Sequence, residues 1–166
     1  MSVRVTDADI ARLIGQPKPV PADWRTKLTP KAKRGHSEAQ LDVVGVDGDA
    51  FRIIVRQTLS NLLAFSVILA WRAPGSNVLF RLRRYNGRAH WHSNTIEADR
   101  FYSAHIHLAT ERYQAIGERE DFFAEPSNRF ADLDGALACM AVDCALAAPG
   151  PSQLTLFDWE ADDADR

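Results

Sequence analysis

Residues 62–87 read LLAFSVILAWRAPGSNVLFRLRRYNG, and this stretch decides the fold. It opens on a continuous apolar run, residues 62–71, which is typical of a strand buried on both faces. A Pro-Gly turn then leads into a second strand over residues 78–85. The following Asn86-Gly87 pair is a strong short-range hairpin signal and predicts a return strand over residues 88–92.

Outward from this centre, the sequence alternates between strand and turn signals, and then becomes helical. Towards the N-terminus, residues 41–46 and 51–58 predict two strands joined by Asp47-Gly48-Asp49. Short turns between successive strands indicate an antiparallel β-meander of about five strands. Two or three helices complete an α+β single domain. The predicted helices are residues 6–15, residues 110–116 and residues 132–147, whereas residues 101–107 fit a strand or a helix.

Three segments are expected along the chain: an N-terminal helix and basic connector (1–35), an α+β core domain (36–148) and a flexible C-terminal tail (149–166).

Hydrophobic content of 46% and charged content of 25% are those of an ordinary globular protein. No apolar run reaches membrane-spanning length, and residues 1–7 lack the charged-then-apolar layout expected of a signal peptide. Cys139 and Cys144 are expected to be free thiols, because their spacing places them on different helical faces. We therefore expect a cytoplasmic protein with no membrane partner.

The net charge of −2 hides an uneven distribution along the chain. Residues 1–92 carry 15 Lys/Arg and 7 Asp/Glu, whereas residues 93–166 carry 5 and 15. Halves this unequal suggest a basic surface for DNA or RNA. The alternative is that the two halves interleave in space and neutralise one another.

The predicted hairpin at 78–92 is the most basic part of the core. Alternation along a strand would place Arg81, Arg83 and Tyr85 on one face. Arginines beside an aromatic ring suit phosphate contacts and base stacking. The nucleic-acid-binding candidates are Arg81, Arg83, Arg84, Tyr85 and Arg88. The alternative is a solvated sheet face whose charges prevent edge aggregation.

Four of the five histidines form two His-x-His pairs, His90/His92 and His105/His107. Such pairs are able to bind zinc or a redox metal, with Glu97 or Asp99 as a carboxylate ligand. The spacing matches no named zinc signature. The sequence alone therefore assigns no metal and no cofactor, although these four histidines are the metal-ligand candidates.

Metal-free RNA cleavage would use some of the same residues. It needs a base, an acid and a group that stabilises the phosphorane charge. His105, His107 and Glu111 are the catalytic candidates, with nearby arginines binding the phosphate. The alternative is that these histidines make structural hydrogen bonds.

The C-terminal peptide Gln153-Leu154-Thr155-Leu156-Phe157 resembles the motif by which bacterial polymerases and repair proteins bind the replication sliding clamp. In that resemblance, Leu156 and Phe157 fill an apolar pocket, Leu154 a neighbouring groove, and Gln153 hydrogen-bonds at the rim. The alternative is an apolar strap packed on the domain.

A second resemblance covers residues 84–144. The prompting motifs are Arg84-Tyr85-Asn86-Gly87, His105-Ile106-His107 and Thr110-Glu111-Arg112-Tyr113-Gln114. Together they resemble an uncharacterised family of small prokaryotic proteins, which implies no particular activity. The layout is also similar to that of small toxins from toxin–antitoxin modules.

Three functions follow as hypotheses. The first is a nucleic-acid-associated accessory protein, of a mobile-element or defence type, recruited to the sliding clamp. The second is a small toxin-like nuclease with a His/Arg/Glu site, whose tail would bind an antitoxin. The third is a non-catalytic protein-interaction module.

Overall fold

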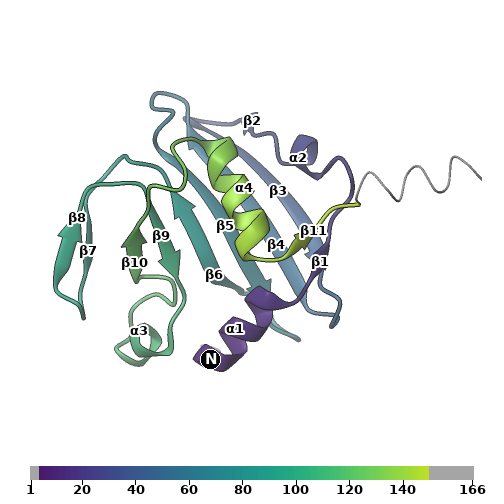
Figure 1. Ribbon diagram of the computed structural model, residues 1–166, viewed down its shortest axis with the longest axis horizontal. Coiled ribbons are helices and arrows are strands. Elements are labelled where there is room, and N and C mark those ends of the chain that lie inside the picture. Colours follow the sequence, from purple (N-terminus) through teal and green to yellow (C-terminus); the bar gives the residue numbers. More distant parts are fainter. Residues whose placement is uncertain (1–3, 150–166) are drawn as a thin grey trace, which may run out of the picture.

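The computed structural model describes residues 4–149 and has an α+β architecture (Figure 1). Seven antiparallel strands form the main sheet in the order β10-β9-β6-β5-β4-β3-β2. Their bounds are Lys31–Ala32 (β2), His36–Val44 (β3), Ala50–Thr58 (β4), Phe65–Arg72 (β5), Leu79–Asn86 (β6), His105–Leu108 (β9) and Ala124–Pro126 (β10).

Two small strand pairs and four helices complete the fold. β1 (Lys18–Pro19) pairs in parallel with β11 (Leu146–Ala147), and β7 (His92–Asn94) pairs antiparallel with β8 (Asp99–Phe101). The helices are α1 (Asp7–Gly15), α2 (Trp24–Lys27), α3 (Glu111–Ala115) and α4 (Leu133–Asp143). The predicted α+β class is confirmed, although about five strands and two or three helices were expected. No helix within residues 4–149 is long and apolar enough to cross a membrane.

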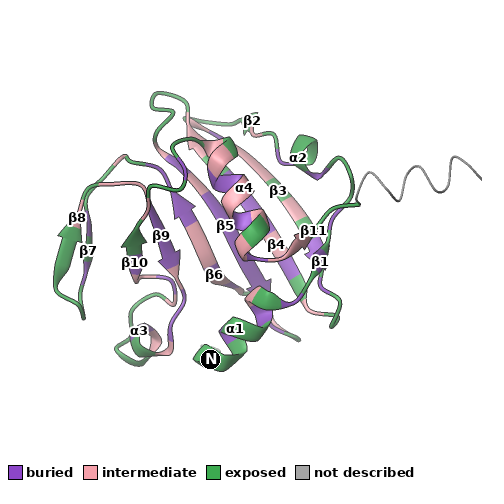
Figure 2. Cartoon of the chain, viewed as in Figure 1, coloured by how far each residue is buried: buried purple, intermediate pink, exposed green. Residues whose placement is uncertain are grey.

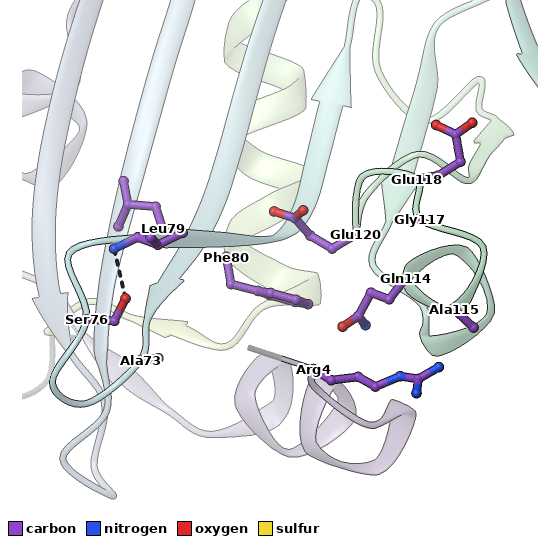
Figure 3. Close-up of a pocket in the computed structure, with 11 residues that line it drawn as sticks. Arg4, Ala73, Ser76, Leu79, Phe80, Gln114, Ala115, Gly117, Glu118 and Glu120 are labelled. Atoms are coloured by element: carbon purple, nitrogen blue, oxygen red, sulfur yellow. Dashed lines mark hydrogen bonds between the residues drawn. The ribbon is translucent and has the colours of Figure 1, made fainter. Parts of the chain in front are cut away.

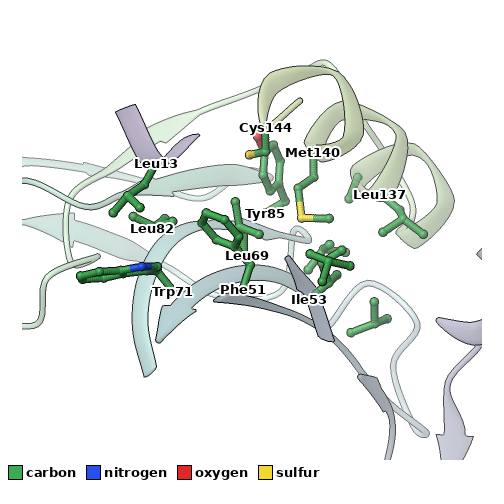
Figure 4. Packing of buried hydrophobic residues seen from close by; sticks show 14 of the residues in the cluster. Leu13, Phe51, Ile53, Leu69, Trp71, Leu82, Tyr85, Leu137, Met140 and Cys144 are labelled. Atoms are coloured by element: carbon green, nitrogen blue, oxygen red, sulfur yellow. The ribbon is translucent and has the colours of Figure 1, made fainter. Parts of the chain in front are cut away.

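The core lies between β5 and α4, and it confirms the strand predicted from the apolar run. Val67 and Leu69 of β5 are fully buried, as are Met140 of α4 and Cys144 just beyond its end (Figure 4). Figure 2 shows burial along β5 and β9 and exposure on the outer side of α1. The apolar stripe of α4 packs on the sheet, since its residues recur every three or four positions. Both cysteines are free thiols, as expected.

The N-terminal segment is built into this same core. Thr6 caps α1 by accepting a hydrogen bond at Oγ1 from the Asp9 backbone N–H, 3.0 Å away. β2 adds an edge strand to β3, so part of the predicted basic connector belongs to the sheet. The core residues contributed by this segment are Val5, Ile10, Leu13, Val20, Trp24 and Leu28.

The hairpin predicted at Asn86-Gly87 does not form. β6 pairs with β9, and residues 92–94 pair with β8 in a separate hairpin. Gly87 is not among the glycines with positive φ, so it does not form the left-handed turn that the dipeptide suggested. A Cβ at Gly87 would overlap the Leu63 carbonyl oxygen and the Phe65 ring. This glycine is therefore required for close packing.

A β-bulge also changes the predicted faces of β6. Arg83 pairs with Leu69 and Arg81 with Ala70, which leaves Leu82 without a partner. Arg81 and Arg84 consequently share one face of the sheet. Arg83 lies instead on the α4 side with Tyr85, so the predicted grouping of Arg81, Arg83 and Tyr85 is wrong.

Candidate metal centre

Three buried histidines from two strands converge on one face of the sheet. In β9, His105 and His107 point to the same side because alternate residues of a strand share a face. His92 of β7 covers them, with its ring centroid 5.4 Å from that of His105 and 4.9 Å from that of His107. One ring nitrogen from each of the three lies within 4.8 Å of the other two.

Both histidines of β9 donate one ring N–H to a backbone carbonyl. His105 Nδ1 lies 2.8 Å from the Ser103 carbonyl oxygen, and His107 Nδ1 lies 2.8 Å from that of Asp121. A carbonyl oxygen only accepts hydrogen bonds, so Nδ1 carries the proton in each ring. The Nε2 of each neutral imidazole therefore holds a free lone pair.

His92 is oriented by the side chain of Asn94. Asn94 Nδ2 donates to Asp99 Oδ1 and to the Ala124 carbonyl, and Asn94 Oδ1 accepts from the Ala124 N–H. These three bonds define which atom of the amide is oxygen. His92 Nε2, 2.9 Å from Asn94 Oδ1, must therefore be the donor, and its Nδ1 holds the lone pair.

Burial keeps the two histidines of β9 uncharged at neutral pH. Burial lowers the pKa of His105 to about 4, and burial with the nearby charge of Arg84 lowers the pKa of His107 to about 2. Neutral imidazoles whose second nitrogen is held by a carbonyl or amide oxygen are what metal-binding histidines require.

The spacing of the three nitrogens is close to that of a mononuclear centre. Zinc–nitrogen bonds of about 2.0–2.1 Å place tetrahedral ligand atoms about 3.3 Å apart. The three nitrogens lie within 4.8 Å of one another, so the widest pair would need to approach by up to about 1.5 Å on binding. The ring centroid of the exposed His90 lies 5.1 Å from that of His105, but His90 is not part of the group whose nitrogens lie within 4.8 Å of one another.

A buried ion pair borders the histidines. Arg84 Nη2 lies 3.0 Å from Oδ2 of Asp121, whose side chain is completely buried. No N–H points at either carboxylate oxygen, so the contact is electrostatic and not a hydrogen bond. Arg119 and Arg81 approach the same carboxylate at 3.6 and 3.9 Å, respectively. Three arginines around one carboxylate leave a net positive charge beside the cluster.

The structure places Glu111 away from the histidine cluster. Its Oε2 accepts the Asp7 backbone N–H at 2.8 Å, while its own N–H donates to Asp7 Oδ1. These bonds join the first turns of α1 and α3. The candidates Glu97 and Asp99 are also engaged, Glu97 with Arg112 and Tyr113, and Asp99 with Asn94.

The predicted nucleic-acid-binding set is divided between different surroundings. Tyr85 is fully buried and donates its hydroxyl to Asp143 Oδ2 at 2.7 Å, so its ring has no face for a base. Arg83 lies 3.7 Å from the same carboxylate. Arg81 and Arg84 face Asp121, whereas Arg88 is exposed. Several basic residues of the N-terminal half therefore pair with acidic residues of the C-terminal half.

Two cavities bear on access to the centre. One of about 300 Å³ is lined by His90 and Asn86, beside the histidines, and by His36 and Arg56 from the neighbouring strands. A cavity of about 530 Å³ lies elsewhere, between the β5–β6 turn and α3, and includes Arg4, Phe80 and Glu120 (Figure 3). No histidine lines this second cavity. His92, His105 and His107 line neither cavity, and the first cavity approaches them only at Asn86 and His90.

Sequence reasoning found the four histidines but missed the residues that organise them. Asn94 carries a usable signal, since an amide two residues after His92 lies on the same face of a strand. The parts played by Arg84 and Asp121 have no local signal, because they depend on how β6 and β9 pair.

Comparisons with family models, curated proteins and solved structures find no match. The residues proposed as clamp-binding, Gln153, Leu154, Leu156 and Phe157, lie outside the described residues.

Proposed function

We propose that this protein binds a divalent transition metal through His92, His105 and His107, with one coordination position open to solvent or substrate. The supporting observation is that each of the three buried imidazoles uses one nitrogen as a donor and keeps a lone pair on the other. Buried polar groups are rarely left half-satisfied without a reason. Zinc is the preferred ion because it favours neutral imidazoles and four-coordinate sites.

The chemistry that fits this centre is metal-assisted hydrolysis of an anionic substrate. A three-histidine site with an open position lowers the pKa of a bound water and polarises a substrate oxygen. Arg84 adds positive charge beside the centre, so an anion in the open position is favoured over a neutral ligand. His90, at the edge of the adjoining cavity, is placed to exchange protons with solvent.

This proposal is preferred to metal-free RNA cleavage for a specific reason. An acid–base pair works best with pKa values near the operating pH. Burial lowers the pKa of both His105 and His107 far below neutrality, to about 4 and about 2. Neither imidazolium would be populated enough to act as an acid, and Glu111 is engaged with α1.

Metal competition tests the proposal. The purified full chain is stripped with a chelator and titrated with Zn²⁺ in the presence of a colorimetric indicator, and Co²⁺ spectra report the geometry. One ion per chain with submicromolar affinity is expected, and His105→Ala or His107→Ala should weaken binding at least 100-fold. His36→Ala is the matched control, since His36 is half-buried, contacts the Arg34 carbonyl and Glu38, and does not belong to the histidine group. Equal loss in His36→Ala, or no wild-type binding, would refute the metal centre.

A second candidate function keeps the clamp motif. We propose that the protein is a nucleic-acid-associated accessory protein recruited to the sliding clamp by residues 153–157. The favouring observation is that the motif follows β11 (Leu146–Ala147) in sequence, beyond the strands and helices of residues 4–149. Calorimetry with a bacterial clamp should give micromolar affinity. A Leu156→Ala/Phe157→Ala variant that binds as well as the wild type would exclude this function.

A further inference from the structure

The hairpin of β7 and β8 presents an exposed aromatic pair that the histidine centre does not use. Trp91 is 57% exposed and Tyr102 39% exposed. They flank the His92–Phe101 pair of the ladder, and their ring centroids are 5.5 Å apart. Exposed tryptophan is unusual because burial of so large an apolar side chain is favourable.

Two arginines flank this edge-to-face aromatic pair, so that four side chains lie in a row. The Arg100 guanidinium lies over the Trp91 ring at 4.3 Å, and that of Arg88 lies near the Tyr102 ring at 5.7 Å. Neither arginine has a carboxylate partner within 4.0 Å among residues 4–149. The row therefore carries two positive charges beside exposed ring faces. We name these four residues the hairpin platform.

The acidic residues of the hairpin point elsewhere. Alternation places Asp99 on the inner face, opposite Asn94 and on the side of His92. Glu97, in the turn, accepts from Arg112 and Tyr113. Among residues 4–149, the outer face of the β7–β8 hairpin thus combines π-faces with positive charge that no carboxylate pairs with.

We infer that the hairpin platform binds single-stranded nucleic acid by stacking unpaired bases on Trp91 and Tyr102 while Arg88 and Arg100 contact phosphates. Single strands suit it because their bases are free to stack on aromatic rings and guanidinium planes. The surface is short and raised on a hairpin, so it offers no groove for a duplex. Because Trp91 and His92 are neighbours on opposite faces, a bound strand would pass close to the histidine centre.

This inference rests on the nucleic-acid part of the second candidate function and is independent of the metal. Fluorescence anisotropy with labelled 12-nucleotide DNA and RNA, in chelator and about 50 mM salt, gives the affinity. Wild-type binding in the micromolar range is expected, with duplex of the same length at least tenfold weaker. A Trp91→Leu/Tyr102→Leu variant should lose at least tenfold, since stacking contributes about 1–3 kcal/mol per base. Leucine retains apolar packing but has no π-face, whereas Trp91→Phe should recover most of the binding.

Arg25 provides a matched control for charge. It lies 5.2 Å from the Trp24 ring, but that ring is buried, so Arg25→Gln removes one positive charge where no base is able to stack, against two in Arg88→Gln/Arg100→Gln. Arg25→Gln should change affinity less than twofold, and Arg88→Gln/Arg100→Gln should also flatten the salt dependence. Unchanged zinc binding, or unchanged circular dichroism if zinc does not bind, would show that the hairpin of each variant is folded.

The outcomes separate the two proposals. No wild-type binding to any oligonucleotide would refute both the platform and the nucleic-acid function. Wild-type binding that survives Trp91→Leu/Tyr102→Leu would refute the platform alone. Polyglutamate competing as well as the oligonucleotide would also refute it, because charge alone would then explain the binding.

Discussion

The chain buries two polar clusters that differ in how completely their hydrogen bonds are satisfied. Lys18 is fully buried, and its Nζ donates to the carbonyls of Ile14, Gln16 and Cys144 at 2.8–3.0 Å. Three acceptors match the three N–H groups of an ammonium. In the histidine cluster, by contrast, each ring satisfies one nitrogen and leaves the other as a lone pair.

This difference separates a structural site from one that is available to a ligand. Lys18 binds carbonyls at the C-terminal ends of α1 and α4, where helices leave backbone acceptors unsatisfied. All three N–H groups of Lys18 are therefore already used in hydrogen bonds to the protein. The histidines are also buried, and their orientation is held by Ser103, Asp121 and Asn94. Within residues 4–149, the only hydrogen-bond contact to their second nitrogens is a long one, from Asn86 Nδ2 to His105 Nε2 at 3.5 Å.

The largest expected effect comes from removing the Lys18 ammonium. Lys18→Met would leave three buried carbonyls without a donor, at about 1–3 kcal/mol each before relaxation. We expect the free energy of unfolding to fall by about 3–5 kcal/mol, measured by urea denaturation. Lys27→Met is the control, since Lys27 is exposed and its pair with Asp23 should contribute less than about 1 kcal/mol. A similar small loss in Lys18→Met would mean that the carbonyls find other donors.

Acid should destabilise the histidine cluster in the metal-free protein. The pKa of His105 is about 4 in the folded chain against an ordinary 6.5, so its stabilising contribution is complete above pH 6.5. It is lost as the pH falls to about 4, because the unfolded chain binds the proton first. At about 1.4 kcal/mol per pKa unit, this is up to about 3 kcal/mol.

Urea unfolding between pH 7 and pH 4, with a chelator present, measures this loss. A His105→Gln variant should show a flatter pH dependence, and His36→Gln should follow the wild type. Parallel curves for wild type and His105→Gln would indicate that the cluster opens to water.

Much of this fold is predictable from the sequence, because it depends on patterns among residues that are close together in the chain. The apolar run of β5, the Thr6 cap of α1 and the stripe of α4 each follow from the spacing of neighbouring residues. The centre was less accessible, because it depends on β6 pairing with β9. The Asn86-Gly87 pair predicted a different partner for β6, a return strand over residues 88–92. Gly87 is instead needed because the chain passes close to Phe65 at this point. No local pattern distinguishes these two uses of glycine.

Zinc should stabilise the histidine cluster without affecting the Lys18 site. A ligand at 100 times its Kd raises the free energy of unfolding by about 2.7 kcal/mol when it binds only the folded state. We expect this gain in the wild type, in His36→Gln and in folded Lys18→Met, but not in His105→Gln. Thermal denaturation with and without Zn²⁺ measures it. An equal gain in His105→Gln would place the ion elsewhere.

Asn94 tests whether orientation of His92 matters for the metal. Its amide bonds to Asp99, Ala124 and His92, and loss of such support lowers metal affinity about 10–100-fold in other sites. We expect that range for Asn94→Ala in competitive chelator titrations. Ser93→Ala, an exposed neighbour on the same strand, is the control. Affinity within threefold of the wild type would mean that packing alone holds the His92 ring.

The smallest expected effect concerns the contact between the Asn86 amide and the second nitrogen of His105. Asn86 Nδ2 lies 3.5 Å from His105 Nε2, a separation at which a hydrogen bond contributes little. Asn86 is held instead by Ser66, whose Oγ donates to Asn86 Oδ1 at 2.7 Å. Asn86→Ala should therefore change zinc affinity less than about threefold, and Ser66→Ala should behave alike. A tenfold increase in Asn86→Ala would show that the amide competes with the metal, and His105 would then be as satisfied as Lys18. A tenfold decrease would make Asn86 part of the support that holds His105.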